Sequence, residues 1–219
     1  MAVIPLYIAT EDALSETVAE RLVAEVNHGL VVAVRIGRRG NGYLRAKLPE
    51  LRKVARSVAV LLLTDLDRTD CPPTLIADWN GDIGNPPEML FRVAVREIEA
   101  WLLADRQGFA DFFHVPMAKL PANPESIDDP KRFLLHLVSR HGRREAKSML
   151  LPERGSKAKI GLGYNQMLGR FVADGWSIER ACTTSDSLDR ARRRLRELTN
   201  QGGHRRSGAS SRSKIMDLE

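Results

Sequence analysis

The stretch VAVLLLTDLD, residues 58–67, is the most continuous run of aliphatic residues in the chain, and it ends in two aspartates. A strand buried on both faces of a parallel sheet reads as such an unbroken apolar run, without the alternation of a half-exposed strand. The run therefore predicts a central strand over residues 58–64. The two aspartates then lie just beyond its carboxyl end.

Outward from this strand, further apolar runs at residues 3–9, 30–36 and 89–95 alternate with stretches of helical period. After the first run, for example, Leu14, Val18 and Leu22 recur at every fourth position, which is typical of an amphipathic helix. Strands that alternate with helices predict an α/β fold, a parallel sheet flanked by helices.

The domain organisation follows from a change of texture near the middle of the chain. Prolines punctuate residues 116–130, and helical patterns dominate afterwards, for example over 133–139 and 188–198. We expect an α/β domain over residues 1–115 and a mostly helical C-terminal half, whose residues 116–200 form an extension packed on it. Residues 201–219 are rich in Gly, Ser and Arg, which predicts a disordered basic tail.

Composition narrows the cellular setting. No apolar run approaches the roughly 20 residues that span a bilayer, and the opening MAVIPLYIAT lacks a basic region and a cleavage site. The two cysteines, Cys71 and Cys182, have no metal-site spacing and no companions for a disulfide framework, as in a reducing compartment. We expect a cytoplasmic protein without a membrane segment.

Charge is distributed unevenly along the chain, whose net charge is +6. Residues 1–130 carry 14 Lys and Arg against 19 Asp and Glu, whereas residues 131–219 carry 20 against 9. A basic surface binds nucleic acid by neutralising phosphates and releasing counterions, but it also serves as a solubilising face, and both interpretations stay open. The candidates for nucleic-acid binding are Arg143, Arg144, Arg154, Lys157, Lys159, Arg192, Arg193 and Arg194.

Acidic residues follow the predicted strands at the edge where parallel sheets bind ligands. Asp65 and Asp67 point to the same side if the chain stays extended, and Mg²⁺ prefers such oxygen ligands. The alternative is that Asp65 caps the next turn and Asp67 is merely exposed. Glu11 follows the first strand, and clustered carboxylates there would repel one another unless a divalent cation were bound.

Further acids extend the candidate set for Mg²⁺ or Mn²⁺. Asp12 and Glu16 lie one residue and one helical turn beyond Glu11, although acids are also favoured there by the helix dipole. Glu97 and Glu99 follow the fourth strand. Because residues i and i+2 of a helix diverge, we expect at most one of these two to face the site.

The acid after the first strand, the glycine turn GRRGNG at residues 37–42 and the Asp-x-Asp of residues 65–67 together resemble the TOPRIM domain of topoisomerases, primases and OLD nucleases. The stretches EDALSE at 11–16 and REIEAWLL at 96–103 resemble those of small bacterial TOPRIM-like proteins. The resemblance covers the chain from its start to residue 105. Beyond it, only Tyr164-Asn165 and the segment 185–188 are similar, and weakly so.

This resemblance implies a metal site of Glu11, Asp65 and Asp67 as the catalytic residues, with Glu16 serving a second ion. It implies a Mg²⁺-dependent nuclease, acting in a bacterial defence module with an ATPase partner. One departure is Asp12, since TOPRIM enzymes commonly have glycine after the first acid.

Two other functions compete with the nuclease hypothesis. Asp65-x-Asp67-x-Thr69 fits the nucleophile motif of haloacid-dehalogenase-like phosphatases, and Asp82 echoes their distal acid, but the separation of the two motifs is too short. Alternatively, the acidic cluster binds a cation or nucleotide for regulation, while the basic half docks a partner such as an ATPase.

Overall fold

The computed structural model describes residues 3–26 and 29–209. Its centre is one sheet of four parallel strands in the order β2-β1-β3-β4. The strands are β1 (Ile4–Thr10), β2 (Leu30–Gly37), β3 (Ala59–Asp65) and β4 (Met89–Ala94). The predicted fold class, a parallel sheet flanked by helices with a helical C-terminal half, is confirmed. β1 and β3 are neighbours, so their carboxyl ends share one edge.

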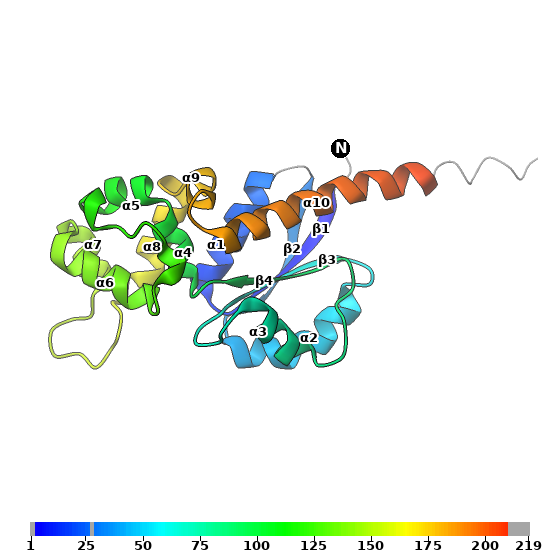
Figure 1. Ribbon diagram of the computed structural model, residues 1–219, viewed down its shortest axis with the longest axis horizontal. Coiled ribbons are helices and arrows are strands. Elements are labelled where there is room, and N and C mark those ends of the chain that lie inside the picture. The colour runs from blue at the N-terminus through cyan, green and yellow to red at the C-terminus, as the bar shows by residue number, and fades with distance from the viewer. Residues whose placement is uncertain (1–2, 27–28, 210–219) are drawn as a thin grey trace, which may run out of the picture.

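Helices cover both faces of the sheet (Figure 1). On one face, α1 (Ala13–Val26) buries the predicted stripe of Leu14, Val18 and Leu22. On the other face lie α2 (Asn41–Val54) and α3 (Pro72–Asn80), which share a second apolar core with the strands. The strand β3 is buried along its length, as its apolar run predicted, and only its last residue, Asp65, is partly exposed.

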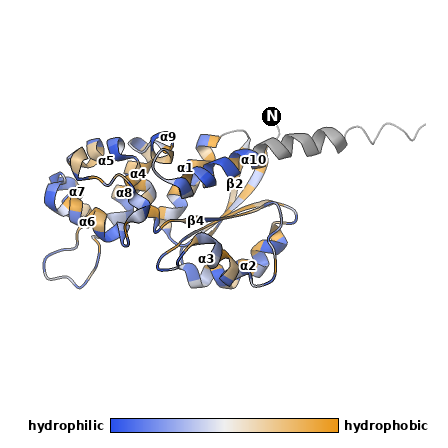
Figure 2. Cartoon of the chain, viewed as in Figure 1, coloured by the Kyte–Doolittle hydropathy of each residue, from blue (hydrophilic) through white to orange (hydrophobic). Residues whose placement is uncertain are grey.

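A helical layer packs beside the sheet (Figure 1), and its buried side chains belong to the same hydrophobic core as those of α1. Figure 2 shows that its helices carry both hydrophilic and hydrophobic surfaces, as amphipathic helices around a core do. No helix of the described residues is long and apolar enough to cross a membrane. The elements are α4 (Ile98–Ala104), α5 (Arg106–Phe113), the short 3₁₀ helices Met117–Lys119 and Pro124–Ser126, α6 (Pro130–His141), α7 (Arg144–Leu150), α8 (Tyr164–Asp174) and α9 (Ile178–Cys182).

The last helix, α10 (Asp186–Ala209), lies along β4 and α1. Its first turn is fixed by Ser187, whose hydroxyl accepts from Trp101 Nε1 (2.7 Å) and donates to Glu125 (2.6 Å). The helix runs past residue 200, where the sequence predicted the start of a disordered tail. The remainder of that predicted tail, residues 210–219, lies outside the described residues.

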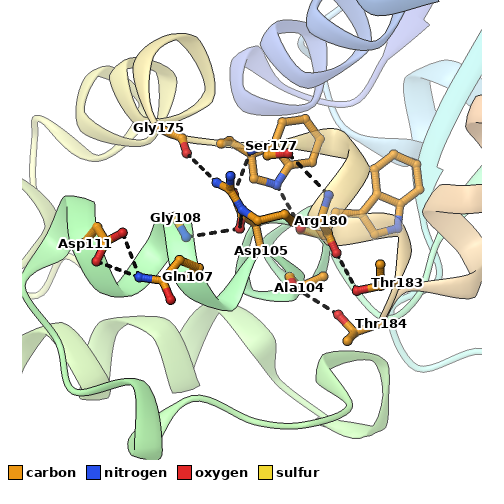
Figure 3. Close-up of polar contacts among 12 residues, drawn as sticks. Ala104, Asp105, Gln107, Gly108, Asp111, Gly175, Ser177, Arg180, Thr183 and Thr184 are labelled. Atoms are coloured by element: carbon orange, nitrogen blue, oxygen red, sulfur yellow. Dashed lines mark hydrogen bonds and ion pairs between the residues drawn. The ribbon is translucent and has the colours of Figure 1, made fainter.

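A buried carboxylate joins the helices of this layer (Figure 3). Asp105, between α4 and α5, is completely buried and accepts hydrogen bonds from Gly108 N (3.0 Å) and Ser177 N (2.7 Å). Arg180 of α9 donates to both oxygens, from Nε at 2.7 Å and from Nη2 at 2.8 Å. Asp105 therefore caps α5 and holds the α8–α9 turn against it.

Candidate functional site

The site begins where β1 and β3 end. Glu11 follows β1, and its Oε1 accepts hydrogen bonds from the Thr64 hydroxyl and from Asp65 N (2.9 Å). Burial raises the pKa of Glu11, and the negative charges of Asp67 and Asp12 raise it further. Because β1 and β3 are neighbours, Glu11 lies at the carboxyl end of β3, within reach of the charges of other acids.

Asp65 connects β3 to the helix that follows β4. Its Oδ1 accepts a hydrogen bond from Ile98 N, the first residue of α4, at 2.9 Å. Burial raises the pKa of Asp65 well above its ordinary range, and the charges of Glu99 and Glu11 add to the effect. This carboxylate therefore lies within the field of acids from two neighbouring strands.

Asp67 does not continue the extended chain on which the predicted convergence with Asp65 depended. Its φ is 51°, in the left-handed region, and both Leu66 N (3.0 Å) and Asp67 N (2.9 Å) donate to Arg96 O. Leu66 is buried, so the chain turns at once to bury it and exposes Asp67. There Asp67 accepts from Asn41 Nδ2 at 3.3 Å.

Asp67 lines an open cleft of about 960 Å³ on the α2 and α3 side of this edge. Three arginines, Arg45, Arg68 and Arg96, also line it, as does Glu97. Arg45 is paired with Asp78, and Arg96 Nη1 donates to Thr69 O at 2.8 Å. The cleft therefore offers cationic and carboxylate groups side by side.

The sequence predicted that at most one of Glu97 and Glu99 would face the site, but Glu97 lines the cleft and the charge of Glu99 acts on Asp65. Both side chains also contact α6. Glu97 has an extended backbone (φ −137°, ψ 160°) and precedes the helix, so the divergence of helical i and i+2 positions does not apply. Its Oε2 accepts from Lys131 N at 2.9 Å, and burial raises its pKa. Glu99 Oε1 accepts from the Tyr164 hydroxyl (2.7 Å) and lies 3.3 Å from Lys131 Nζ.

Glu99 is the most deeply placed acid of the site. It has no exposed surface, and its Oε2 has no hydrogen-bond partner among the described residues. A buried carboxylate oxygen without a donor is costly, since ionised groups lose their hydration on burial. The close acids Asp65 and Glu97 increase this cost, so the geometry favours a further cation at Glu99.

Lys131 and Tyr164 were missed as site residues by sequence reasoning. Burial and the charge of Glu99 raise the pKa of the Tyr164 hydroxyl, which therefore stays a hydrogen-bond donor. Its only signal was the weak similarity at Tyr164-Asn165. The signal at Lys131 is its place in the first turn of α6, where the helix dipole disfavours a cation.

Two predicted ligands have other partners. Both carboxylate oxygens of the buried Glu16 are hydrogen-bonded to Arg38, from Nε at 3.0 Å and from Nη2. Asp12 Oδ1 accepts from Ser15 N (2.8 Å) in the first turn of α1. The preceding residue, Gly37, lies so close to β1 that a Cβ atom there would be 1.8 Å from Thr10 O. Glycine is therefore required for the turn that places Arg38 beside Glu16. The charge of Glu16 is thus already balanced.

The basic candidates fall into two groups. The three on α10 are all paired: Arg192 with Glu25 of α1, Arg193 with Asp189 and Arg194 with Glu197. Arg143 is paired with Glu145 and packs over the Phe112 ring, and Arg144 begins α7. In contrast, Arg154, Lys157 and Lys159 are exposed on the loop 151–163, and no ion pair joins them to another described residue. The loop projects beyond α6 and α7 in Figure 1.

The donor set suits a hard divalent cation. Glu11, Asp65 and Glu99 supply carboxylate oxygens, the ligands that Mg²⁺ and Mn²⁺ take, and the unpartnered Glu99 oxygen is an open position among them. Among residues 3–26 and 29–209, no group of three or more His, Cys, Asp or Glu side chains is arranged so that it could hold a metal ion as it stands. In this structure N–H and hydroxyl donors occupy Glu11 Oε1 and Asp65 Oδ1, and Tyr164 and Lys131 occupy Glu99 Oε1.

No protein-family model, curated protein or solved structure matches this chain. The resemblance to TOPRIM domains accordingly rests on the sequence motifs alone, at residues 11–16, 37–42, 65–67 and 96–103.

Proposed function

We propose that this chain is a divalent-metal-dependent phosphodiester hydrolase that acts on nucleic acid. The observation that carries this proposal is the set of carboxylates beyond the ends of three adjacent strands: Asp65 lies in the electrostatic field of Glu11 and Glu99, and one buried oxygen of Glu99 has no hydrogen-bond partner in the described residues. Perturbed carboxyl groups at the ligand edge of a parallel sheet are typical of functional sites.

The carboxylates Glu11, Asp65 and Glu99 would hold Mg²⁺ or Mn²⁺, with Asp67 at the cleft as a further ligand. A bound cation would supply positive charge to phosphate oxygens and favour ionisation of water. Glu97 lines the cleft with a carboxyl whose pKa is raised by burial, which suits it to accept a proton from attacking water. Arg68 and Arg96 lie in the same cleft, where they can orient a phosphate.

Nucleic acid is the substrate class that the charge distribution favours. The cleft of about 960 Å³ is lined by three arginines and five acids, so a bound divalent cation would be needed to balance the acids when a polyanion enters. The exposed cations of the loop 151–163 add sites for phosphates outside the cleft. A polyanionic chain can therefore contact both the carboxylate edge and the basic loop.

The phosphatase alternative has less support. Its second motif needs Asp82, but the segment from α3 to β4 that carries Asp82 leads into the amino end of β4. Asp65 lies at the carboxyl end of the adjacent parallel strand β3. The two acids are therefore assigned to opposite edges of the sheet, where they cannot act on one phosphate.

The test is cleavage of single- and double-stranded DNA and RNA with Mg²⁺, with Mn²⁺ and with EDTA. Glu99→Gln keeps the size of the side chain, and we expect it to reduce metal-dependent cleavage roughly 100-fold or more, because it removes a ligand charge. Asp78→Asn is the matched control. It removes a carboxylate that lines the same cleft but is exposed and paired with Arg45, and we expect about twofold change or less.

Calorimetric titration with Mn²⁺ separates the remaining outcomes. Metal binding that depends on Glu99, without cleavage of any nucleic acid, would favour the regulatory alternative. Absence of metal binding by the wild-type protein would contradict the proposed function.

A further inference from the structure

Lys131 is placed where local structure gives no reason for a lysine. It is in the first turn of α6, at the positive end of the helix dipole, which favours acids and disfavours cations. Its side chain is about two-thirds buried, with 36% of its surface exposed, and partial burial of an ammonium group is unfavourable unless it is paired. The reason for Lys131 must therefore lie in its tertiary contacts.

Among the described residues, the hydrogen bond and ion pair that Lys131 makes outside α6 are both with the carboxylate centre. Lys131 Nζ lies 3.3 Å from Glu99 Oε1, and Lys131 N donates to Glu97 Oε2 at 2.9 Å. Burial works to lower the pKa of the ammonium group, but the charges of Glu99, Glu97 and Asp65 outweigh burial and hold that pKa above its ordinary value. One positive charge from α6 thus faces three acids from the edge of the sheet.

We infer that Lys131 is the resident counter-ion of the carboxylate centre, and that Mg²⁺ or Mn²⁺ binds there in competition with its ammonium group. This inference rests on the proposed function, because it concerns the same cation site. The ammonium engages Glu99 Oε1 and leaves Oε2 without a partner, so it balances the cluster only in part. A divalent cation carries twice the charge of the ammonium group, so its attraction to these carboxylates at the position of Lys131 is stronger.

The structure also provides space for Lys131 to move. A cavity of about 380 Å³ is lined by Lys131 together with Asp129, Arg132, Leu135, Lys159 and Ile160. The flexible side chain of a lysine can turn from Glu99 toward this cavity without a shift of α6. Binding of the cation would then place the Lys131 ammonium group on the side of α6 that faces Lys159 of the loop 151–163.

The experiment is titration of the full chain with Mn²⁺ by isothermal calorimetry. Lys131→Met removes the charge and keeps an unbranched side chain, and we expect about tenfold or tighter Mn²⁺ binding, because the competitor is lost. Arg132→Met is the matched control: it removes the same charge at the next residue of α6, whose side chain has no ion pair with a described residue. We expect its Mn²⁺ affinity to change by about threefold or less.

Thermal unfolding gives a second readout. Without metal, Lys131→Met should melt below the wild type, because Glu99 loses its counter-ion, and Mn²⁺ should raise its melting temperature more than it raises that of the wild type. Lys131→Gln, which keeps an N–H donor for Glu99 without the charge, should behave in the same direction. If both variants fold only with Mn²⁺, the inference is supported. If neither folds even then, the cation does not replace Lys131 and the inference is overturned.

Two results separate this inference from the proposed function. Mn²⁺ binding to the wild type that Lys131→Met leaves unchanged or weakens overturns the inference alone. If neither the wild type nor Lys131→Met binds Mn²⁺, the metal site itself is wrong, and both fail.

Discussion

At the scale of single residues, Asp65 carries the clearest electrostatic signature of the site. Its pKa is raised in the folded chain by burial, Glu99 and Glu11, and is ordinary in the unfolded chain. Between these two pKa values the folded protein holds a proton that the unfolded chain releases. The stabilising contribution is therefore present below about pH 4 and is lost as the pH rises through the folded pKa.

We predict that Asp65→Asn, in EDTA, becomes progressively more stable than the wild type as the pH rises from about 4 to 8. Asparagine keeps an oxygen acceptor for Ile98 N but does not ionise. Urea unfolding across this range measures the difference. Asp82→Asn, an exposed carboxylate on the far segment, is the control and should show no trend. A constant difference between Asp65→Asn and the wild type would contradict the raised pKa.

Tyr164 supports Glu99, and this contact can be tested without metal. Tyr164→Phe removes the hydroxyl that donates to Glu99 Oε1 at 2.7 Å. We predict a loss of about 1–3 kcal/mol in the free energy of unfolding, because a buried carboxylate then lacks a second donor. Tyr43→Phe is the control, since Arg39 contacts the Tyr43 ring, which phenylalanine keeps. An equal effect of both changes would remove the specific role of Tyr164.

At the scale of secondary-structure elements, the sequence was most informative about strands. The strand β3 was predicted over residues 58–64 and spans Ala59–Asp65, because burial on both faces requires an unbroken apolar run. Asp65 and Asp67 were identified as candidate site residues because they stand at the end of this apolar run. The turn that exposes Asp67 was only the alternative to an extended chain, since it depends on hydrogen bonds to Arg96 O across the sheet. Lys131 and Tyr164 were missed because their contacts depend on how the helical layer packs.

The helices of this layer are joined by the buried carboxylate of Asp105, which pairs with the half-exposed Arg180. Asp105→Ala removes the acceptor for Gly108 N, Ser177 N and Arg180, and leaves the Arg180 guanidinium hydrogen-bonded to Gly175 O alone among the described residues. We predict a loss of roughly 3 kcal/mol in the free energy of unfolding, because two backbone N–H donors lose their buried acceptor. Asp111→Ala, whose exposed carboxylate contacts Gln107 nearby in Figure 3, should cost about 0.5 kcal/mol or less. Comparable losses in urea denaturation would exclude a special role for Asp105.

At the scale of the whole molecule, the described cations of the C-terminal half are of two kinds, those that form ion pairs within the protein and those that do not. The arginines of α10 form ion pairs within the protein, and Arg192 joins α10 to Glu25 of α1. The sequence could not make this distinction, because composition counts charges without their partners. Where the structure describes the chain, the loop 151–163 presents Arg154, Lys157 and Lys159 without ion pairs, so these cations are available to a polyanion, although the exposed Glu153 lies in the same loop.

We predict that the loop, more than α10, supplies the phosphate contacts. The combined change of Arg154, Lys157 and Lys159 to Gln should reduce the slope of log K against log salt by about 2–3, since each lost contact lowers it by about one. The matched control changes Arg190, Arg193 and Arg194 of α10, which are paired with Asp186, Asp189 and Glu197, and should alter the slope by less than about one. Fluorescence anisotropy with a labelled oligonucleotide measures both, in a Glu99→Gln background that prevents cleavage. If the α10 variant lowers the slope and the loop variant does not, the nucleic acid follows α10, and its ion pairs must open to bind it.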